Sequence, residues 1–173
     1  EKYPFNLDIF RRTDRIELKT PTTLFVGENG TGKSTLLKAV ARRCGIFLWA
    51  ESEIPRVEFN PYEDRLCEYM DVAWTRERVP GAFFSSAHFQ YFSECLEDWA
   101  TDDPGMLDYF GGQSLLTQSH GQSLMSYFSA RYRREGLYLL DEPETALSPA
   151  RQLELLKLLV EMGRAGHAQF LVA

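Results

Sequence analysis

A short stretch near the start of the chain, GENGTGKS at 27–34, has the residue types and the spacing of a phosphate-binding loop. Gly27, Gly30 and Gly32 would let the backbone curl with positive φ and approach a phosphate without a Cβ in the way. The N–H groups from about residue 29 to residue 34 would then point at the phosphate, reinforced by the positive end of the helix that follows. The stretch therefore predicts a nucleotide site.

Two side chains of this loop are expected to act on the nucleotide directly. Lys33 would reach the β- and γ-phosphate oxygens and serve catalysis, and the Ser34 hydroxyl would bind Mg²⁺. The nucleotide-binding residues expected in the loop are Gly27, Asn29, Gly30, Thr31, Gly32, Lys33, Ser34 and Thr35.

Hydrolysis needs a carboxylate as well, and the stretch GLYLLDEP at 136–143 supplies two at the end of an apolar run. Asp141 suits the Mg²⁺ shell, most simply through a water molecule. Glu142 is adjacent, points differently in an extended chain, and suits a general base that polarises the attacking water. The two carboxylates predict nucleotide hydrolysis rather than binding alone.

The elements around these residues favour an α/β fold. A β-rich run at 22–26 enters the loop, and apolar residues at helical spacing follow it from Lys33 to Gly45. The order of strand, loop, helix, insertion, strand, helix and strand predicts a parallel sheet with helices on its faces. Further strands are expected at 15–19, 81–87, 136–143 and 168–173, and further helices at 123–132 and from Pro149 onward.

Composition narrows the class of protein. The chain has 173 residues, 44% of them hydrophobic and 25% charged, and a formal net charge of −6. These values are typical of a globular domain and do not indicate a strongly basic nucleic-acid binder, although Arg131, Arg133 and Arg134 could form a local patch. The three cysteines form no CxxC pair and no apolar run is long enough to span a membrane, so a reducing cytoplasm and no membrane insertion are expected.

A third motif makes the pattern more specific. QSHGQS at 118–123 precedes Asp141 by about the distance at which ABC-type ATPases carry their signature loop, and the chain resembles that family in all three places. The resemblance implies a P-loop NTPase fold, binding of ATP and Mg²⁺, and a homodimer that closes head-to-tail around ATP. It implies that Ser119, Gly121 and Gln122 bind the nucleotide held by the second copy, with His120 in place of a glycine. The stretch ETALSP at 144–149 resembles the D-loop at the dimer interface.

The sequences of these motifs resemble those of the non-transporter branches of the family more than those of transporter domains. These branches include the SMC and RecF heads and the small bacterial predicted AAA-family ATPases. The insertion is too short for SMC-type arms. We expect one ATPase domain, with a core at about 1–50 and 133–173 and an inserted, mainly helical lobe at about 51–132 that carries the signature loop. The resemblance places a switch histidine just after the strand at 168–173, so the chain is expected to stop before that residue.

Other functional residues stay open. The family's Q-loop, which senses Mg²⁺ and water, would fall at 83–92, where Gln90 is the first candidate metal contact and His88 the alternative. An aromatic core with incidental polar residues explains both equally well. Tyr3, Phe5 and Phe10 precede the first strand and are candidates to stack on adenine, but a core role suits each better.

Such an ATPase could drive one of two kinds of process. The first is a conformational change in a DNA-related or defence process, with DNA or a protein as partner. The alternative is an ATP-binding subunit that energises a membrane transporter. A nucleotide-gated module without turnover would leave the Asp141–Glu142 pair without a purpose, and a kinase would leave both Glu142 and the stretch at 118–123 unexplained.

Overall fold

A computed structural model describes residues 2–49, 60, 62 and 64–173, and its centre is a parallel sheet. The strands are β1 (Thr22–Leu24), β2 (Gly81–Ser85), β3 (Gly136–Asp141) and β4 (Ala168–Val172), in the order β1-β4-β3-β2. Every neighbouring pair is parallel, so all four strands end at the same edge. The prediction of an α/β fold with a parallel-sheet core is confirmed.

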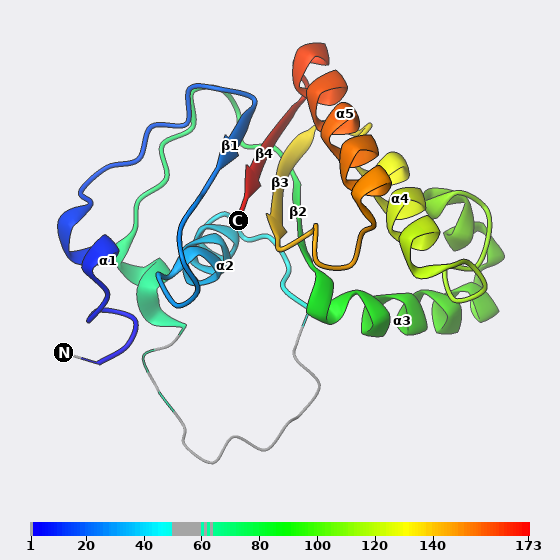
Figure 1. The fold of residues 1–173 in the computed structure, drawn as a ribbon, viewed down its shortest axis with the longest axis horizontal. Helices are drawn as coiled ribbons and strands as arrows, with labels where there is room; N and C mark the ends of the chain where they lie inside the picture. Colours follow the sequence, from blue (N-terminus) through cyan, green and yellow to red (C-terminus); the bar gives the residue numbers. More distant parts are fainter. Residues whose placement is uncertain (1, 50–59, 61, 63) are drawn as a thin grey trace.

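The first face of the sheet packs against α2 (Lys33–Arg43), the helix that follows the glycine-rich loop (Figure 1). Leu37 and Ala41 of this helix share a core cluster with Leu139 of β3 and Leu171 of β4. Side chains on a strand alternate between faces, and every residue of β3 is buried. β3 is therefore covered on both sides, as the apolar run of its sequence predicted.

The second face is covered by α3 (Phe89–Asp102), α4 (His120–Arg131) and α5 (Pro149–Ala165), which Figure 1 draws on the side opposite α2. Their cluster includes Phe92 and Phe128 from the helices, and Tyr138 and Phe170 from β3 and β4. Two short 3₁₀ helices, η2 (Ser86–His88) and η3 (Pro104–Phe110), connect these elements. We call this cluster the aromatic core; it joins the lobe to the sheet.

The described part of the lobe's expected range holds α3, α4 and short 3₁₀ helices with irregular stretches between them, and residues 50–59, 61 and 63 lie outside the described residues. β2 falls within the range assigned to the lobe and pairs with β3 as an edge strand of the sheet. No helix in the described part of the chain is long and apolar enough to cross a membrane.

The N-terminal residues form α1 (Asp8–Arg12) and an irregular segment that leads into β1. The strand expected at 15–19 is absent, and that prediction was wrong. The amide of Gln169 donates to the carbonyl oxygens of Leu18 and Thr20, both at 3.3 Å, so a side chain takes carbonyls that a ladder would have used.

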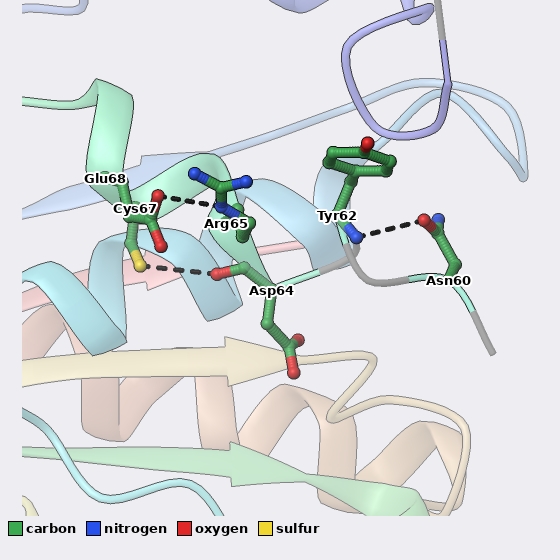
Figure 2. Close-up of polar contacts among 6 residues, drawn as sticks. All are labelled: Asn60, Tyr62, Asp64, Arg65, Cys67 and Glu68. Carbon is green, nitrogen blue, oxygen red and sulfur yellow. Dashed lines mark hydrogen bonds and ion pairs between the residues drawn. The ribbon is translucent and has the colours of Figure 1, made fainter.

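A segment that precedes β2 lies beside α2 and contacts the N-terminal residues. It contains η1 (Arg65–Tyr69), whose Arg65 pairs with Glu68 at 2.9 Å, and Figure 2 shows this pair beside the Cys67–Asp64 contact. Asp64 forms an ion pair with Arg42 of α2 at 2.6 Å. The Asn60 amide donates to the Tyr3 carbonyl oxygen at 2.9 Å, so the segment contacts both the helix and the N-terminal residues.

Candidate functional site

The glycine-rich loop joins β1 to α2 at the edge where the strands end. Gly30 and Gly32 have φ of 80° and 98°, in the left-handed region that other residues rarely adopt. Gly27 does not have positive φ, so that part of the prediction was wrong. Its lack of a side chain matters for a different reason, because a Cβ there would lie 3.2 Å from Thr31 Oγ1.

Lys33 reaches back across the loop that precedes it. Its Nζ donates to the carbonyl oxygens of Gly27 at 2.8 Å and Glu28 at 2.9 Å. Thr31 closes the same turn by donating to the Glu28 carbonyl at 2.8 Å. The first helical bond of α2 runs from Leu36 N to Gly32 O, and the N–H groups of a helix's first turn lack intrahelical acceptors. A cation and several donors thus gather at the loop, which is the donor set that phosphate binding needs.

Asp141 lies at the end of β3, close to the start of α2. Its side chain is 7% exposed, and Oδ1 is buried without a hydrogen-bond partner among the described residues. Burial raises the pKa of the Asp141 carboxyl, while a hydrogen bond from Ser34 and the charge of Lys38 act in the opposite direction. The structure therefore brings together the carboxylate and the hydroxyl that were predicted to hold Mg²⁺.

These two groups fit a magnesium ion. No cluster of three or more His, Cys, Asp or Glu side chains exists in the described part of the chain. Mg²⁺ is bound in nucleotide sites by one or two protein groups, with water and phosphate oxygens completing its shell. Ser34 and Asp141 offer two oxygen donors, and the orphaned Oδ1 of Asp141 is an acceptor that a hydrated cation would satisfy.

Replacing Asp141 by asparagine is expected to stabilise the protein in metal-free buffer at neutral pH. The raised pKa means that the folded state disfavours the carboxylate, so this group costs stability as the pH rises above its unfolded pKa. We therefore expect a higher melting temperature; in a chain of this size, each 1 kcal/mol of stability corresponds to roughly 2–4 °C.

The gain of the Asp141→Asn variant should shrink toward pH 4, where the wild-type carboxyl binds a proton. Asp98→Asn, at an exposed position on α3, is the matched control and should change the melting temperature little at either pH. An Asp141→Asn protein that melts at or below the wild-type temperature at neutral pH would contradict the strained-carboxylate interpretation.

Glu142 directly follows the strand and is held in an unusual conformation. Its φ is 49°, the one positive value for a non-glycine residue in the described chain. Its N–H donates to the carbonyl oxygen of Ala173 at 2.8 Å, and Ala173 N donates to Leu140 O at 2.9 Å. The backbone thus turns sharply after Asp141, and the Glu142 side chain is exposed while that of Asp141 is buried. The two neighbouring carboxylates have different surroundings, as their different predicted roles require.

The predicted signature residues lie at the start of α4. Gln122 turns back to the N-cap, where its Oε1 accepts from Ser119 N at 3.2 Å and from Ser119 Oγ at 2.7 Å. Gly121 faces α5, since a Cβ there would lie 3.7 Å from Arg151 Cγ. α4 covers the sheet face opposite α2, so a single copy does not bring this loop to Lys33. Their role in nucleotide binding stays a prediction.

The remaining candidates differ in their surroundings. Gln90 is exposed on α3 and donates to Glu94 at 2.9 Å, on the same helix. His88 ends η2 and is close enough to Asp141 to contribute, as the smallest of several groups, to lowering the pKa of the Asp141 carboxyl. Tyr3 hydrogen-bonds through its hydroxyl to Thr35 Oγ1 at the start of α2. Asn29 lies in the loop and is exposed.

The other two aromatic candidates for adenine stacking are engaged with protein groups. Phe5 packs edge-on against Tyr69, with ring centroids 5.1 Å apart. The ring of Phe10, with Leu7, lies against the backbone of Gly32, where an added Cβ would come within 3.1 Å of Phe10 Cζ. Both rings are half-buried and belong to neither of the two core clusters, so the core role that the sequence favoured stays a prediction. The Phe10 contact places the N-terminal segment against the glycine-rich loop.

Sequence reasoning missed one polar link beside Glu142. The Thr145 hydroxyl lies 2.9 Å from the Glu142 carbonyl oxygen and 3.0 Å from Ser86 Oγ. The stretch at 144–149 had been assigned to a dimer interface, so a contact of Thr145 within one copy was not considered. The only sign of this contact in the sequence is a threonine three residues after Glu142, and that spacing is too common to predict a hydrogen bond.

Comparison with known proteins supports a P-loop ATPase. A family model described as an AAA domain matches residues 5–45, which span the N-terminal segment, the loop and α2. The achromobactin transport ATP-binding protein of Dickeya dadantii (strain 3937) is 26% identical over 168 residues, which is 87% of this chain and 62% of the relative. No solved structure matches the chain significantly.

Two further relatives come from Bacillus. A probable siderophore transport system ATP-binding protein of Bacillus subtilis (strain 168) is 26% identical over 86% of this chain and 60% of its own length. The petrobactin import ATP-binding protein of Bacillus anthracis is 25% identical over 86% and 61%. The chain thus spans about three fifths of the length of the curated relatives it matches. The expected non-transporter branch is not confirmed by these matches.

Proposed function

We propose that this chain is a Mg²⁺-dependent ATPase that binds ATP at its glycine-rich loop and closes as a homodimer around the nucleotide. One observation carries the proposal. The loop lysine, the Ser34 hydroxyl and the buried Asp141 carboxylate lie where the strands end, and Ser34 is close enough to Asp141 to lower the pKa of its carboxyl. This convergence of a cation, a hydroxyl and a strand-end carboxylate suits a Mg²⁺–phosphate complex.

Each residue then has a chemical task. Mg·ATP supplies the phosphoanhydride bond that is cleaved and the metal charge that offsets the phosphate oxygens. Lys33 binds phosphate oxygens, while Ser34 and Asp141 hold the metal, Asp141 through water. Glu142 takes a proton from the attacking water while the water oxygen bonds to the γ-phosphorus and ADP leaves. The exposure of Glu142 and the burial of Asp141 support this division of roles.

The proposed dimer accounts for the position of the signature loop. Ser119, Gly121 and Gln122 lie at the start of α4, the helix that covers the sheet face opposite α2. The start of a helix of α4's length is a suitable anion site, which a second copy's nucleotide would fill. Sedimentation with and without Mg·ATP tests this, and a chain that stays monomeric at saturating ATP would contradict the dimer.

The process that the ATPase drives is supported best on the transport side. The relatives carry names of ATP-binding proteins in achromobactin, siderophore and petrobactin transport, and they support the alternative of an ATP-binding subunit that energises a membrane transporter. The DNA-related or defence process is supported by the resemblance of the motif sequences to the non-transporter branches, and these matches do not support it. Co-purification with a membrane protein in detergent would favour transport, and ATP-dependent retention on DNA would favour the other process.

Replacing Lys33 by alanine is expected to weaken the binding of Mg·ATP by about 10- to 100-fold. This range corresponds to the loss of charge-assisted hydrogen bonds worth about 1.5–3 kcal/mol. Equilibrium titration with a fluorescent ATP analogue measures it. Lys157→Ala, an exposed lysine of α5, is the control. If Lys33→Ala binds the analogue as tightly as Lys157→Ala does, the loop is not the nucleotide site.

A further inference from the structure

The turn that carries Glu142 has to be held in place, because its backbone conformation is unfavourable for this residue type. A side chain with a Cβ at positive φ crowds the backbone, and a glutamate at 49° persists only where surrounding contacts determine it. On its N-terminal side, the Glu142 N–H is bound by the carbonyl oxygen of Ala173. A second contact, to the carbonyl group of Glu142, is needed to fix the residue on its C-terminal side.

Thr145 holds that other side. Its N–H and its hydroxyl both reach the Glu142 carbonyl oxygen, at 3.3 Å and 2.9 Å. The two peptide groups that flank the Glu142 Cα are therefore both hydrogen-bonded, one to β4 and one to Thr145. Rotation of Glu142 out of its left-handed conformation would break bonds on both sides.

The hydroxyl of Thr145 has a second contact that reaches outside the turn. It lies 3.0 Å from Ser86 Oγ, at the end of β2 and the start of η2. A hydroxyl has one hydrogen to donate and can also accept, so both contacts are satisfied when Ser86 donates to Thr145 and Thr145 donates to the carbonyl. η2 leads from the end of β2 into α3.

The later part of the same loop is fixed separately. Gln152, in the first turns of α5, donates its amide to the carbonyl oxygens of Glu144 at 3.2 Å and Leu147 at 3.1 Å. Loss of the Thr145 hydroxyl would therefore leave the Glu142 carbonyl with only the longer bond from the Thr145 N–H, while the loop stays anchored to α5. The effect of such a loss should be local to Glu142.

We propose that Thr145 is the positioning residue for Glu142, and that the Thr145–Ser86 hydrogen bond ties the general base to the end of β2. Thr145 itself touches no nucleotide. It sets the backbone of Glu142, so that the carboxylate faces the attacking water, and it makes that position depend on the segment that leads into α3. The inference rests on the proposed role of Glu142 in ATP hydrolysis.

Steady-state hydrolysis and ATP titration of Thr145→Val test the inference, since valine keeps the shape and removes the hydroxyl. We expect kcat to fall about five- to tenfold, the size of one neutral hydrogen bond, while KM and ATP affinity stay within twofold. Thr145→Ser, which restores a hydroxyl, should recover most of kcat. Ser86→Ala removes one of the two contacts and should give a smaller loss of kcat that still exceeds twofold.

The matched control is Thr101→Val. Thr101 is an exposed threonine at the end of α3 whose hydroxyl donates to the Glu97 carbonyl oxygen at 3.2 Å, remote from the strand ends. A kcat of Thr145→Val within twofold of that of Thr101→Val would overturn the inference. So would a change confined to KM, or a loss that Thr145→Ser does not recover. If Thr145→Val does not fold, Ser86→Ala decides by the same comparison.

The same series separates this inference from the proposed function. Glu142→Gln is measured in parallel. If that variant keeps the wild-type rate, the general-base assignment fails and the inference fails with it. If Glu142→Gln loses activity while Thr145→Val behaves like the control, the proposed function stands and only the positioning role is wrong.

Discussion

Replacing Glu142 by glutamine is expected to lower the rate of ATP hydrolysis by at least about 100-fold and to leave ATP binding intact. A positioned general base contributes roughly 100- to 10,000-fold to such reactions, and the amide cannot accept the proton of water. Glutamine has the same shape, and Glu142 is exposed, so the fold should tolerate the change. Phosphate release measures turnover, and titration with an ATP analogue measures binding.

The Glu142→Gln variant should also accumulate as an ATP-bound dimer, because closure would no longer be followed by hydrolysis. Sedimentation in Mg·ATP measures the dimer. Glu161→Gln is the matched control, since Glu161 is an exposed glutamate of α5 outside the stretch at 144–149. Equal hydrolysis rates for the two variants would show that Glu142 is not the base.

Replacing Phe170 by alanine is expected to destabilise the fold by about 3–5 kcal/mol, the usual cost of removing a buried aromatic ring. Phe170 is 0% exposed at the centre of β4. Its ring lies 5.2 Å from that of Tyr132 and 5.5 Å from that of Tyr138, so the cavity would open within the aromatic core. Urea unfolding followed by circular dichroism measures the change, without any nucleotide present.

The control for this variant is Phe47→Ala, since that ring is 70% exposed at the surface. We expect it to change the free energy of unfolding by less than about 1 kcal/mol. Similar losses from the two variants would mean that β4 does not lie at the centre of the sheet, and would contradict the strand order described above. Because neither residue touches the candidate site, this test is independent of the proposed function.

The elements that could be predicted from the sequence are those with a complete local signal. β3 has an apolar run followed by two acids, and α5 has Pro149 at its first position, where a missing N–H costs nothing. α2 begins directly after a left-handed glycine. In each case neighbouring residues determine the element, so no distant partner had to be known.

Where the sequence failed, the outcome depended on residues far along the chain. The alternation at 15–19 suits a strand, yet Gln169 takes the carbonyl oxygens of Leu18 and Thr20. The same limit applies to the site. The pairing of Ser34 with Asp141 followed from two motifs, whereas the left-handed conformation of Glu142 has no local signal, because glutamate rarely adopts it. The roles of the site residues stay predictions.

The aromatic core has a mechanical consequence. Phe84 of β2, Phe92 of α3, Phe128 of α4 and Phe170 of β4 belong to one contiguous cluster. Moving α3 or α4 away from the sheet would expose these rings to water at a large cost in free energy. A displacement of the lobe would therefore be transmitted directly to the sheet. The lobe and the sheet are thus expected to move as one rigid body, so in the proposed dimer the ATP-driven movement would be between the two copies rather than within one.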